Sequence, residues 1–206
     1  MKGLYAITPD EADSGRLFAL VRAALAGGTP VLQYRNKRAD AAQRLREACE
    51  LRALCRAAGT TFIVNDDARL ALEVGADGVH LGRDDGDPVA ARALLGRRLI
   101  GVSCYDSLAA AQSAVAAGAD YVAFGSVFPS PTKPGAVRAP LELFGRARSL
   151  GVPVAGIGGI GLANAPELLA AGADCIAVIS DLFAAADVTA RARAFAELFP
   201  KRTTPT

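Results

Sequence analysis

The sequence lacks several features that define familiar protein classes. No segment approaches the roughly 20 apolar residues that a membrane-spanning helix needs. The first ten residues, MKGLYAITPD, contain no cleavage signal. No basic run occurs, and basic residues are not interleaved with aromatic ones as in a nucleic-acid groove. These absences predict a cytoplasmic protein that binds neither membranes nor nucleic acids.

Cysteine and histidine are scarce, with four cysteines and one histidine in 206 residues. Cys49, Cys55, Cys104 and Cys175 have neither the CxxC spacing of a metal site nor a secreted disulfide pattern. We therefore expect buried thiols in a reducing compartment. The single histidine, His80, has no evident His, Cys or Glu partner nearby, which favours a packed core residue over a catalyst.

What the sequence does have is a regular alternation of short apolar runs and longer helical segments rich in Ala, Leu and Arg. This alternation is typical of repeated βα units around a parallel sheet. The predicted strands are 4–7, 31–35, 62–65, 78–81, 99–102, 121–124, 154–157 and 175–179. Eight such units in one domain-sized chain favour a single (β/α)8 TIM barrel over an open doubly wound sheet.

A weak internal repeat supports this count of units. Gly-Ala-Asp followed by a strand recurs at Gly75, Gly118 and Gly172, and each glycine is expected to close the helix before it. The second predicted helix has apolar residues every three or four positions, which leaves Glu47 on its wetter side. The whole chain, residues 1–206, is predicted to be one domain with a frayed tail at 199–206.

Polar residues gather where the predicted strands end. At the end of the second strand the period of two places Gln33, Arg35 and Lys37 on one side. A strand face exposed to solvent would explain them, but barrel strands are covered on both faces. Burying unpaired Arg and Lys side chains there would cost free energy. We therefore interpret these residues as part of a ligand site.

Carboxylates follow the next two strands. Asn65, Asp66 and Asp67 end the third strand, and Asp84 and Asp85 come shortly after the fourth. Hard carboxylate oxygens suit Mg²⁺ carried with a phosphate. One of Asp66 and Asp67 is expected instead to cap the helix that follows.

The later strands carry weaker signals. Ser103 follows the fifth strand, where a serine usually caps a helix. The long 126–139 loop is typical of an active-site lid and would deliver Lys133. The glycine-rich segment that ends at Gly159 lies at the end of strand seven, and the segment that ends at Ser180 lies at the end of strand eight. Barrels commonly bind phosphate on the loops that follow these two strands.

Together these motifs resemble those of the thiamine-phosphate synthase family, from Gly3 to about Phe199. The matching segments are Gln33-x-Arg35-x-Lys37, Asn65-Asp66, Gly75-Ala-Asp-Gly-Val-His80-Leu-Gly-x-x-Asp85, Gly101-Val-Ser103, Ser130-x-Thr132-Lys133, Gly156-Ile-Gly-Gly159 and Val178-Ile-Ser180. The resemblance implies that hydroxymethylpyrimidine diphosphate is joined to a carboxylated thiazole phosphate. The products would be thiamine phosphate, diphosphate and carbon dioxide, and Mg²⁺ is implied as cofactor.

The resemblance also implies a role for each matching residue. The pyrimidine diphosphate would be contacted by Gln33, Tyr34, Arg35, Asn36, Lys37 and Asn65. Mg²⁺ would be bound by Asp66 and Asp85, and the diphosphate would be reached by Ser103 and Lys133. The thiazole phosphate would be held by Ser130, Pro131, Thr132, Gly159, Ile179 and Ser180.

The chemistry of these residues agrees with the implied reaction. Diphosphate leaves readily only when its charge is neutralised, here by Mg²⁺, Lys37, Lys133 and Arg35, with Ser103 as a further donor. Departure would leave a pyrimidine cation, which the thiazole nitrogen can attack if the two rings are held together. No enzyme base is required, which agrees with the scarcity of histidine.

Three positions depart from the family pattern, and two other functions stay open. Arg83 stands where Gln is usual, Tyr105 where His is frequent, and Ser130 where Thr is frequent. A related thiazole tautomerase of the same barrel relies on a histidine at the position of Tyr105. A non-catalytic sensor of phosphorylated ligands is the other alternative. The retained charged groups favour the synthase, and a homo-oligomer is left open.

Overall fold

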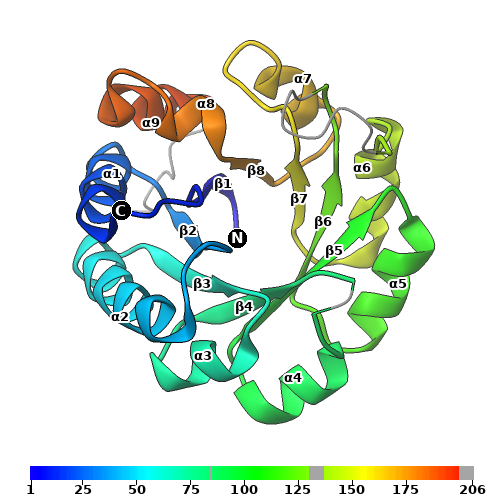
Figure 1. Cartoon of the computed structure of the whole chain (residues 1–206). Helices are drawn as coiled ribbons and strands as arrows, with labels where there is room; N and C mark the ends of the chain where they lie inside the picture. Colours follow the sequence, from blue (N-terminus) through cyan, green and yellow to red (C-terminus); the bar gives the residue numbers. More distant parts are fainter. Residues whose placement is uncertain (84, 130–136, 200–206) are drawn as a thin grey trace, which may run out of the picture.

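The computed structural model, which describes residues 1–83, 85–129 and 137–199, forms a closed barrel of eight parallel strands (Figure 1). The strands pair in sequence order and β8 closes the barrel against β1. They are β1 (Gly3–Ile7), β2 (Val31–Tyr34), β3 (Thr61–Asn65), β4 (Gly78–Leu81), β5 (Leu99–Tyr105), β6 (Tyr121–Gly125), β7 (Val154–Ile157) and β8 (Cys175–Val178). The predicted (β/α)8 fold is confirmed.

Helices surround the barrel on its outside (Figure 1). They are α1 (Ser14–Ala26), α2 (Ala41–Ala58), α3 (Ala68–Glu73), α4 (Pro88–Leu95), α5 (Leu108–Ala116), α6 (Glu142–Ala147), the 3₁₀ turn η1 (Arg148–Leu150), α7 (Ala165–Ala170), α8 (Ser180–Phe183) and α9 (Val188–Glu197). Aspartate side chains cap the amino ends of α1 to α4 and of α9. Within the described residues, no helix has the length and apolar character needed to cross a membrane.

The core has two layers, which follow from the alternation of side chains along each strand. In β1, Tyr5 and Ile7 point into the barrel, while Leu4 and Ala6 pack outward against the helices. The inner layer contains Tyr5, Ile7, Val31, Ile63, Tyr121, Ala123, Ala155, Cys175 and Ala177. The barrel is therefore filled by side chains, and ligands are confined to its ends.

The Gly-Ala-Asp repeat fixes the turns at the amino-terminal end of the barrel. Gly75, Gly118 and Gly172 have positive φ angles of 65°, 96° and 112°, as expected for glycines that end helices. Each aspartate two residues later accepts the N–H of a residue at the start of the preceding strand, at 2.8 to 2.9 Å. The repeat thus ties each turn to its neighbour at the end of the barrel opposite the strand tips.

The predictions for cysteine and for some strand ends need correction. Cys55, Cys104 and Cys175 are buried, and burial raises the pKa of each thiol to about 12. Cys49, by contrast, is exposed on α2, so the expectation of a buried thiol is wrong there. β2 ends one residue before the predicted Arg35, whereas β5 continues to Tyr105.

Candidate active site

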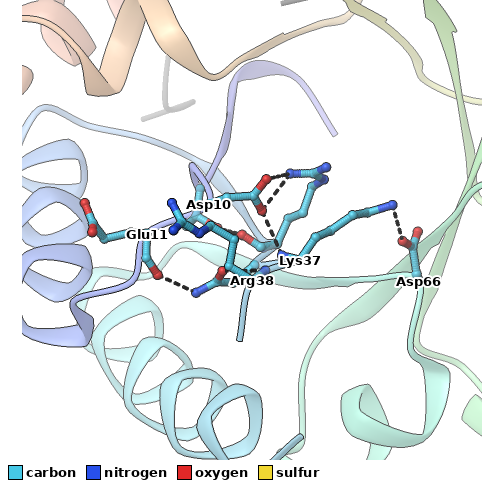
Figure 2. A network of polar contacts seen from close by, with 8 residues as sticks. Asp10, Glu11, Lys37, Arg38 and Asp66 are labelled. Carbon is cyan, nitrogen blue, oxygen red and sulfur yellow. Dashed lines mark hydrogen bonds and ion pairs between the residues drawn. The ribbon is translucent and has the colours of Figure 1, made fainter. Parts of the chain in front are cut away.

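The end of β2 presents its polar side chains at different depths. Gln33 is 2% exposed inside the barrel, where its Nε2 donates to the Tyr5 hydroxyl at 2.7 Å. Beyond the end of the strand, Arg35 donates to both carboxylate oxygens of Asp10 at 2.9 Å. The Lys37 ammonium extends across to Asp66, 3.6 Å from its Oδ2 (Figure 2). The strand therefore supplies one buried donor and two cations on the loop that follows.

Asp10, which the sequence analysis missed, orients both of these cations. Besides pairing with Arg35, it accepts the backbone N–H of Lys37 at 2.8 Å (Figure 2). Partial burial alone would raise the pKa of Asp10, but the hydrogen bonds from Lys37 and Arg35, together with their charges, hold it below its ordinary value. Its position just after the end of the first strand is the signal that could have identified it.

Asp66 and Asp67 have different roles, and one of them caps a helix, as predicted from the sequence. The Asp67 carboxylate caps α3 by accepting the Leu70 N–H at 2.9 Å. Asp66 has a φ of 64°, which is uncommon for a residue with a side chain. Its N–H donates to the His80 carbonyl at 2.8 Å, so the turn is fixed to β4. Because Asp67 takes the cap, the Asp66 carboxylate is left for Lys37 and Asp85.

Asp66 and Asp85 form a pair of like charges. Burial raises the pKa of Asp66, and a hydrogen bond and charge repulsion from Asp85 raise it further, against a smaller opposite effect of Lys37. Gly82 allows this approach, because a Cβ there would overlap Asp85 and lie 3.9 Å from the Asp66 Oδ1. A carboxylate whose pKa is raised by a neighbouring carboxylate is stabilised in its charged form when a cation binds between the two.

A divalent cation fits this pair. Among the described residues, no group of three or more His, Cys, Asp or Glu side chains is arranged to hold a metal. Mg²⁺, however, is usually bound through one or two carboxylates, with phosphate and water completing its shell. Asp66 and Asp85 could therefore hold Mg²⁺ that arrives with a phosphate, whereas a metal held by the protein alone would need more ligands than this pair.

A cleft of about 310 Å³ lies at this end of the barrel. It is lined by Tyr34, Arg35, Asn36, Lys37, Arg44, Val64, Asn65, Asp66, Asp67, Leu70 and Asp85. Apart from Gln33, the predicted site residues of strands two to four thus share one cavity in which both signs of charge are present. Such a cavity suits a ligand with several anionic oxygens that also carries a cation.

Tyr34 and Asn36 direct their polar atoms to a buried carboxylate, Glu47 of α2. Glu47 accepts the Tyr34 hydroxyl at 2.6 Å and the Asn36 amide at 3.1 Å. Ser14 and Gln43 donate to its other oxygen at 2.6 and 2.8 Å. The prediction of a wet side for Glu47 is wrong, since the residue is fully buried. Its four donors compensate for burial and anchor the segment that carries Arg35 and Lys37.

Ser103 and His80 lie together near the ends of β5 and β4. The Ser103 Oγ is 2.9 Å from the His80 Nε2, and α5 is capped by Ser107 instead, so Ser103 is not a helix cap. His80 is buried, as predicted, yet it has polar partners that the sequence did not reveal. Burial lowers the pKa of His80 to about 4, against a small opposite effect of Asp85, so the ring is neutral at pH 7.

The departures Arg83 and Tyr105 are neighbours in space. The Arg83 guanidinium carbon lies 4.4 Å from the centre of the Tyr105 ring, a cation–π contact. Tyr105 has a φ of 54°, and the pairing of β5 with β6 is irregular between Ser103 and Tyr105. The cation of Arg83, which the family pattern lacks, is therefore stacked on the ring of Tyr105, which stands where the family frequently has histidine.

The loop after β7 is packed closely against the segment that leaves β6. Gly159 has a φ of 66°, and a Cβ there would overlap the carbonyl oxygens of Phe128 and Pro129. Asn164, which the sequence analysis missed, donates to the Gly159 carbonyl and accepts the Gly161 N–H, both at 2.9 Å. Glycine is thus required here both for backbone conformation and for space.

After β8, Ile179 leads directly into α8, and Ser180 is its first residue. This helix has only four residues, so its dipole is small and its unpaired N–H groups are what it offers to an anion. Gly159 therefore lies on the loop after β7, as placed from the sequence. β8 ends one residue before the predicted Ile179, and Ser180 begins the helix that follows.

Four predicted residues, Ser130, Pro131, Thr132 and Lys133, lie outside the described residues. The described residues on either side of them are joined to one another by backbone hydrogen bonds. The Ser126 N–H donates to the Val137 carbonyl at 3.3 Å, and the Ala139 N–H donates to the Ser126 carbonyl at 2.9 Å. The segment between these residues begins and ends beside the tip of β6.

Comparisons with known proteins agree with this arrangement. The chain is 62% identical over 201 residues to the thiamine-phosphate synthase of Azoarcus sp. (strain BH72), covering 97% of this chain and 98% of that protein. It is 60% identical to the thiamine-phosphate synthase of Chromobacterium violaceum over 203 residues, 98% of each chain.

Solved structures match along nearly the whole chain. Thiamine phosphate pyrophosphorylase from Pyrococcus furiosus superposes with a TM-score of 0.84 at 37% identity, covering 95% of this chain and 94% of that one. A 3-hexulose-6-phosphate synthase, at 19% identity and a TM-score of 0.70 over 97% of this chain and all of its own, shares the fold. A family model described as thiamine monophosphate synthase matches residues 4–182. The chain therefore belongs to the thiamine monophosphate synthase family.

Proposed function

We propose that the protein is a thiamine-phosphate synthase, which transfers the hydroxymethylpyrimidine group from its diphosphate to thiazole phosphate. The observation that carries the proposal is the meeting of Lys37 with the Asp66–Asp85 pair beside Arg35 and Asp10. Four successive strand ends, those of β1 to β4, supply these charges within a chain that belongs to the family. A ligand that brings both phosphate charge and a divalent cation satisfies all of them.

Mg²⁺ is the proposed cofactor, with Asp66 and Asp85 as its protein ligands. When bound, it would neutralise charge on the diphosphate and so improve it as a leaving group. The raised pKa of Asp66 supports this assignment, because among the described residues the carboxylate pair lacks a sufficient counter-charge. Lys37, 3.6 Å from Asp66, would contact the same diphosphate and add a second positive charge.

The remaining roles of the protein in the reaction are positioning and exclusion of water. Asp10 orients Arg35 and the Lys37 backbone, so that the cations are in place before the ligand arrives. Gln33 and Asn65, at the ends of β2 and β3, are proposed to hold the pyrimidine. Ser103 and Lys133 are proposed to donate to the diphosphate. No side chain needs to remove a proton, which agrees with a neutral, buried His80.

The second substrate is proposed to bind on the other side of the mouth. Gly159, Ile179 and Ser180 would hold the phosphate of the thiazole through backbone N–H groups and a hydroxyl, with Ser130, Pro131 and Thr132 from the loop. The thiazole tautomerase alternative is disfavoured because Tyr105 replaces the histidine on which that reaction depends. We further propose that the chain acts in the cytoplasm as one domain, in keeping with its free cysteines.

A direct assay tests the proposed function. Purified protein is mixed with hydroxymethylpyrimidine diphosphate, thiazole phosphate and Mg²⁺, and thiamine phosphate is measured by its oxidation to a fluorescent product. We expect formation of thiamine phosphate that stops when Mg²⁺ is chelated and resumes when it is restored. No product with either the plain or the carboxylated thiazole phosphate, while the carboxylated thiazole is isomerised, would favour the tautomerase instead.

A further inference from the structure

Five side chains form a continuous hydrogen-bonded path across the interior of the barrel, which we call the polar chain. Gln33 contacts the Tyr5 hydroxyl at 2.7 Å, and the Tyr5 and Tyr121 hydroxyls are 2.7 Å apart. The Tyr121 hydroxyl is 3.1 Å from the His80 Nδ1, and the His80 Nε2 is 2.9 Å from the Ser103 Oγ. The polar chain therefore links a proposed pyrimidine-binding residue to a proposed diphosphate-binding residue.

The polar chain is sealed from water except at Ser103, because its other end, Gln33, is also buried. Tyr5 and Tyr121 are each 1% exposed, and His80 is 8% exposed. Gly101 of β5 makes room for this path, because a Cβ at that position would overlap the ring and hydroxyl of Tyr121. Each internal member thus depends on its neighbours in the polar chain, since solvent cannot replace a lost partner.

The direction of every bond in the polar chain follows from its first member. An amide nitrogen can only donate, so the Tyr5 hydroxyl accepts from Gln33. Its own proton is buried, and leaving it without an acceptor would be costly, so it points to its remaining partner among the described residues, the Tyr121 hydroxyl. Tyr121 accepts that proton and donates its own to the His80 Nδ1, which therefore carries no hydrogen. Burial raises the pKa of both tyrosines above the ordinary value, so both hydroxyls keep their protons.

We infer that the polar chain holds His80 as its Nε2–H tautomer and makes Ser103 a hydrogen-bond donor toward the diphosphate. The Nε2–H donates to the Ser103 Oγ, so the serine proton cannot point back to the histidine and is directed to the mouth. A hydroxyl set in this direction favours an oxygen anion, and it pays no reorientation cost when the ligand binds. Only its diphosphate target rests on the proposed function.

Tyr5, Tyr121 and His80 are thus positioning residues, which act on the ligand through Ser103 and Gln33. The low pKa of His80, about 4, agrees with a ring that passes on a fixed hydrogen-bond direction and takes up no proton at neutral pH. The role assigned to His80 is therefore neither packing alone nor acid–base catalysis.

The single histidine makes the tautomer directly measurable. The full chain is labelled with ¹⁵N-histidine, purified without a histidine tag, and examined without ligand at pH 7.5 by long-range ¹H–¹⁵N NMR. We expect a pyrrole-like Nε2 and a pyridine-like Nδ1. A pyrrole-like Nδ1 would mean that the polar chain runs in the opposite direction, and a doubly protonated ring would mean that it has no fixed direction. Either result overturns the inference.

Two variants test the connection to the site. Tyr121→Phe removes the central hydroxyl, and Gly101→Ala displaces it while leaving it present. Both should give a mixture of His80 tautomers and lower kcat roughly tenfold, as expected for one misdirected hydrogen bond to a charged group. The KM for thiazole phosphate should be unchanged. Normal kcat together with a mixed tautomer would refute the role of Ser103 as an oriented donor.

The matched control is Thr29→Val, which removes a buried hydroxyl bond to the Ala24 carbonyl at the opposite end of the barrel. It should lower stability to a similar extent while leaving the His80 spectrum and kcat as they are. Because the spectrum is recorded without substrate, the direction of the polar chain is decided even if no thiamine phosphate is formed. Activity with the wrong tautomer would overturn only the inference.

Discussion

The two sides of the barrel mouth differ in the chemical groups that they offer to a ligand. Around the ends of β2 to β4, side-chain charges meet in pairs: Arg35 with Asp10, and Lys37 with Asp66. Around the ends of β7 and β8, the predicted phosphate residues are a glycine loop and the start of a one-turn helix. The first side offers formal charges on side chains, and the second offers backbone N–H groups and a hydroxyl.

This difference corresponds to what each substrate's phosphate has to do. A departing diphosphate gains charge in the transition state, and preorganised formal charges stabilise that gain more than they stabilise the ground state. A phosphate that stays on the thiazole keeps its charge throughout, so backbone donors that only bind and orient it are sufficient. Damage to the first side should therefore lower kcat, whereas damage to the second should mainly raise KM.

The largest effect is expected for Asp66→Asn. The change keeps the shape of the side chain but removes one of the two charges that would bind Mg²⁺, and loss of such electrostatic stabilisation typically lowers kcat by about 10²- to 10³-fold. The control is Asp67→Asn, which removes the neighbouring charge but keeps a good cap for α3. Steady-state kinetics at several Mg²⁺ concentrations should separate the two variants. Equal turnover in both would contradict the assignment of Asp66.

Lys133→Ala should have an effect nearly as large, about 10²-fold on kcat, because the cation proposed to contact the leaving group is lost. The melting temperature should stay close to that of the wild type. Lys2→Ala, a change at an exposed lysine beside the start of β1, is the matched control and should leave turnover unaltered. If the purified Lys133 and Asp66 variants both turned over normally, the charged side would have no catalytic role.

Gly159→Ala tests the uncharged side and should raise the KM for thiazole phosphate roughly tenfold with a smaller change in kcat. A Cβ at Gly159 would overlap the carbonyls of Phe128 and Pro129, so the loop after β7 must shift. Gly151→Ala carries a similar backbone penalty, with a φ of 71° against 66°, but meets no atom within 4 Å. If Gly151→Ala raised the same KM equally, general loss of stability would explain the effect. A lower kcat at unchanged KM would erase the contrast between the two sides.

The fold could be predicted from the sequence because it rests on local, repeated signals. Strand-length apolar runs, glycines at the ends of helices and the aspartates of the repeat each act on nearby backbone, and together they fix the order of β and α elements. The division of labour between Asp66 and Asp67 was predictable for the same reason, since a helix cap is a local interaction.

The partners of the site residues could not be predicted, because they come from distant parts of the chain. Asp10 reaches Arg35 across 25 residues, and Tyr5 meets Tyr121 across 116. Glu47 looked solvent-exposed among arginines, since the pattern of its own helix does not reveal donors on α1 and β2. His80 lacked evident partners for the same reason, although its contacts are with Tyr121 and Ser103.

Glu47→Gln should have the smallest effect on the chemistry and a clear effect on stability. Burial alone would raise the pKa of Glu47, but hydrogen bonds from Ser14, Tyr34, Gln43 and Asn36 lower it below its ordinary value. Its contribution is therefore complete above the ordinary glutamate pKa of about 4.3 and is lost as the pH falls through the lower folded value.

Urea unfolding should show Glu47→Gln destabilised by about 1–3 kcal/mol at pH 7, with the two curves converging in acid, because the variant has no charge to lose there. Glu50→Gln, on the same helix in an exposed pair with Arg22, should cost about 0.5 kcal/mol or less. Any kinetic change should be a small decrease in kcat, since Glu47 anchors the β2 side of the mouth, which carries the charged side chains. A pH-independent difference in stability would show that packing, and not the charge of Glu47, holds that side in place.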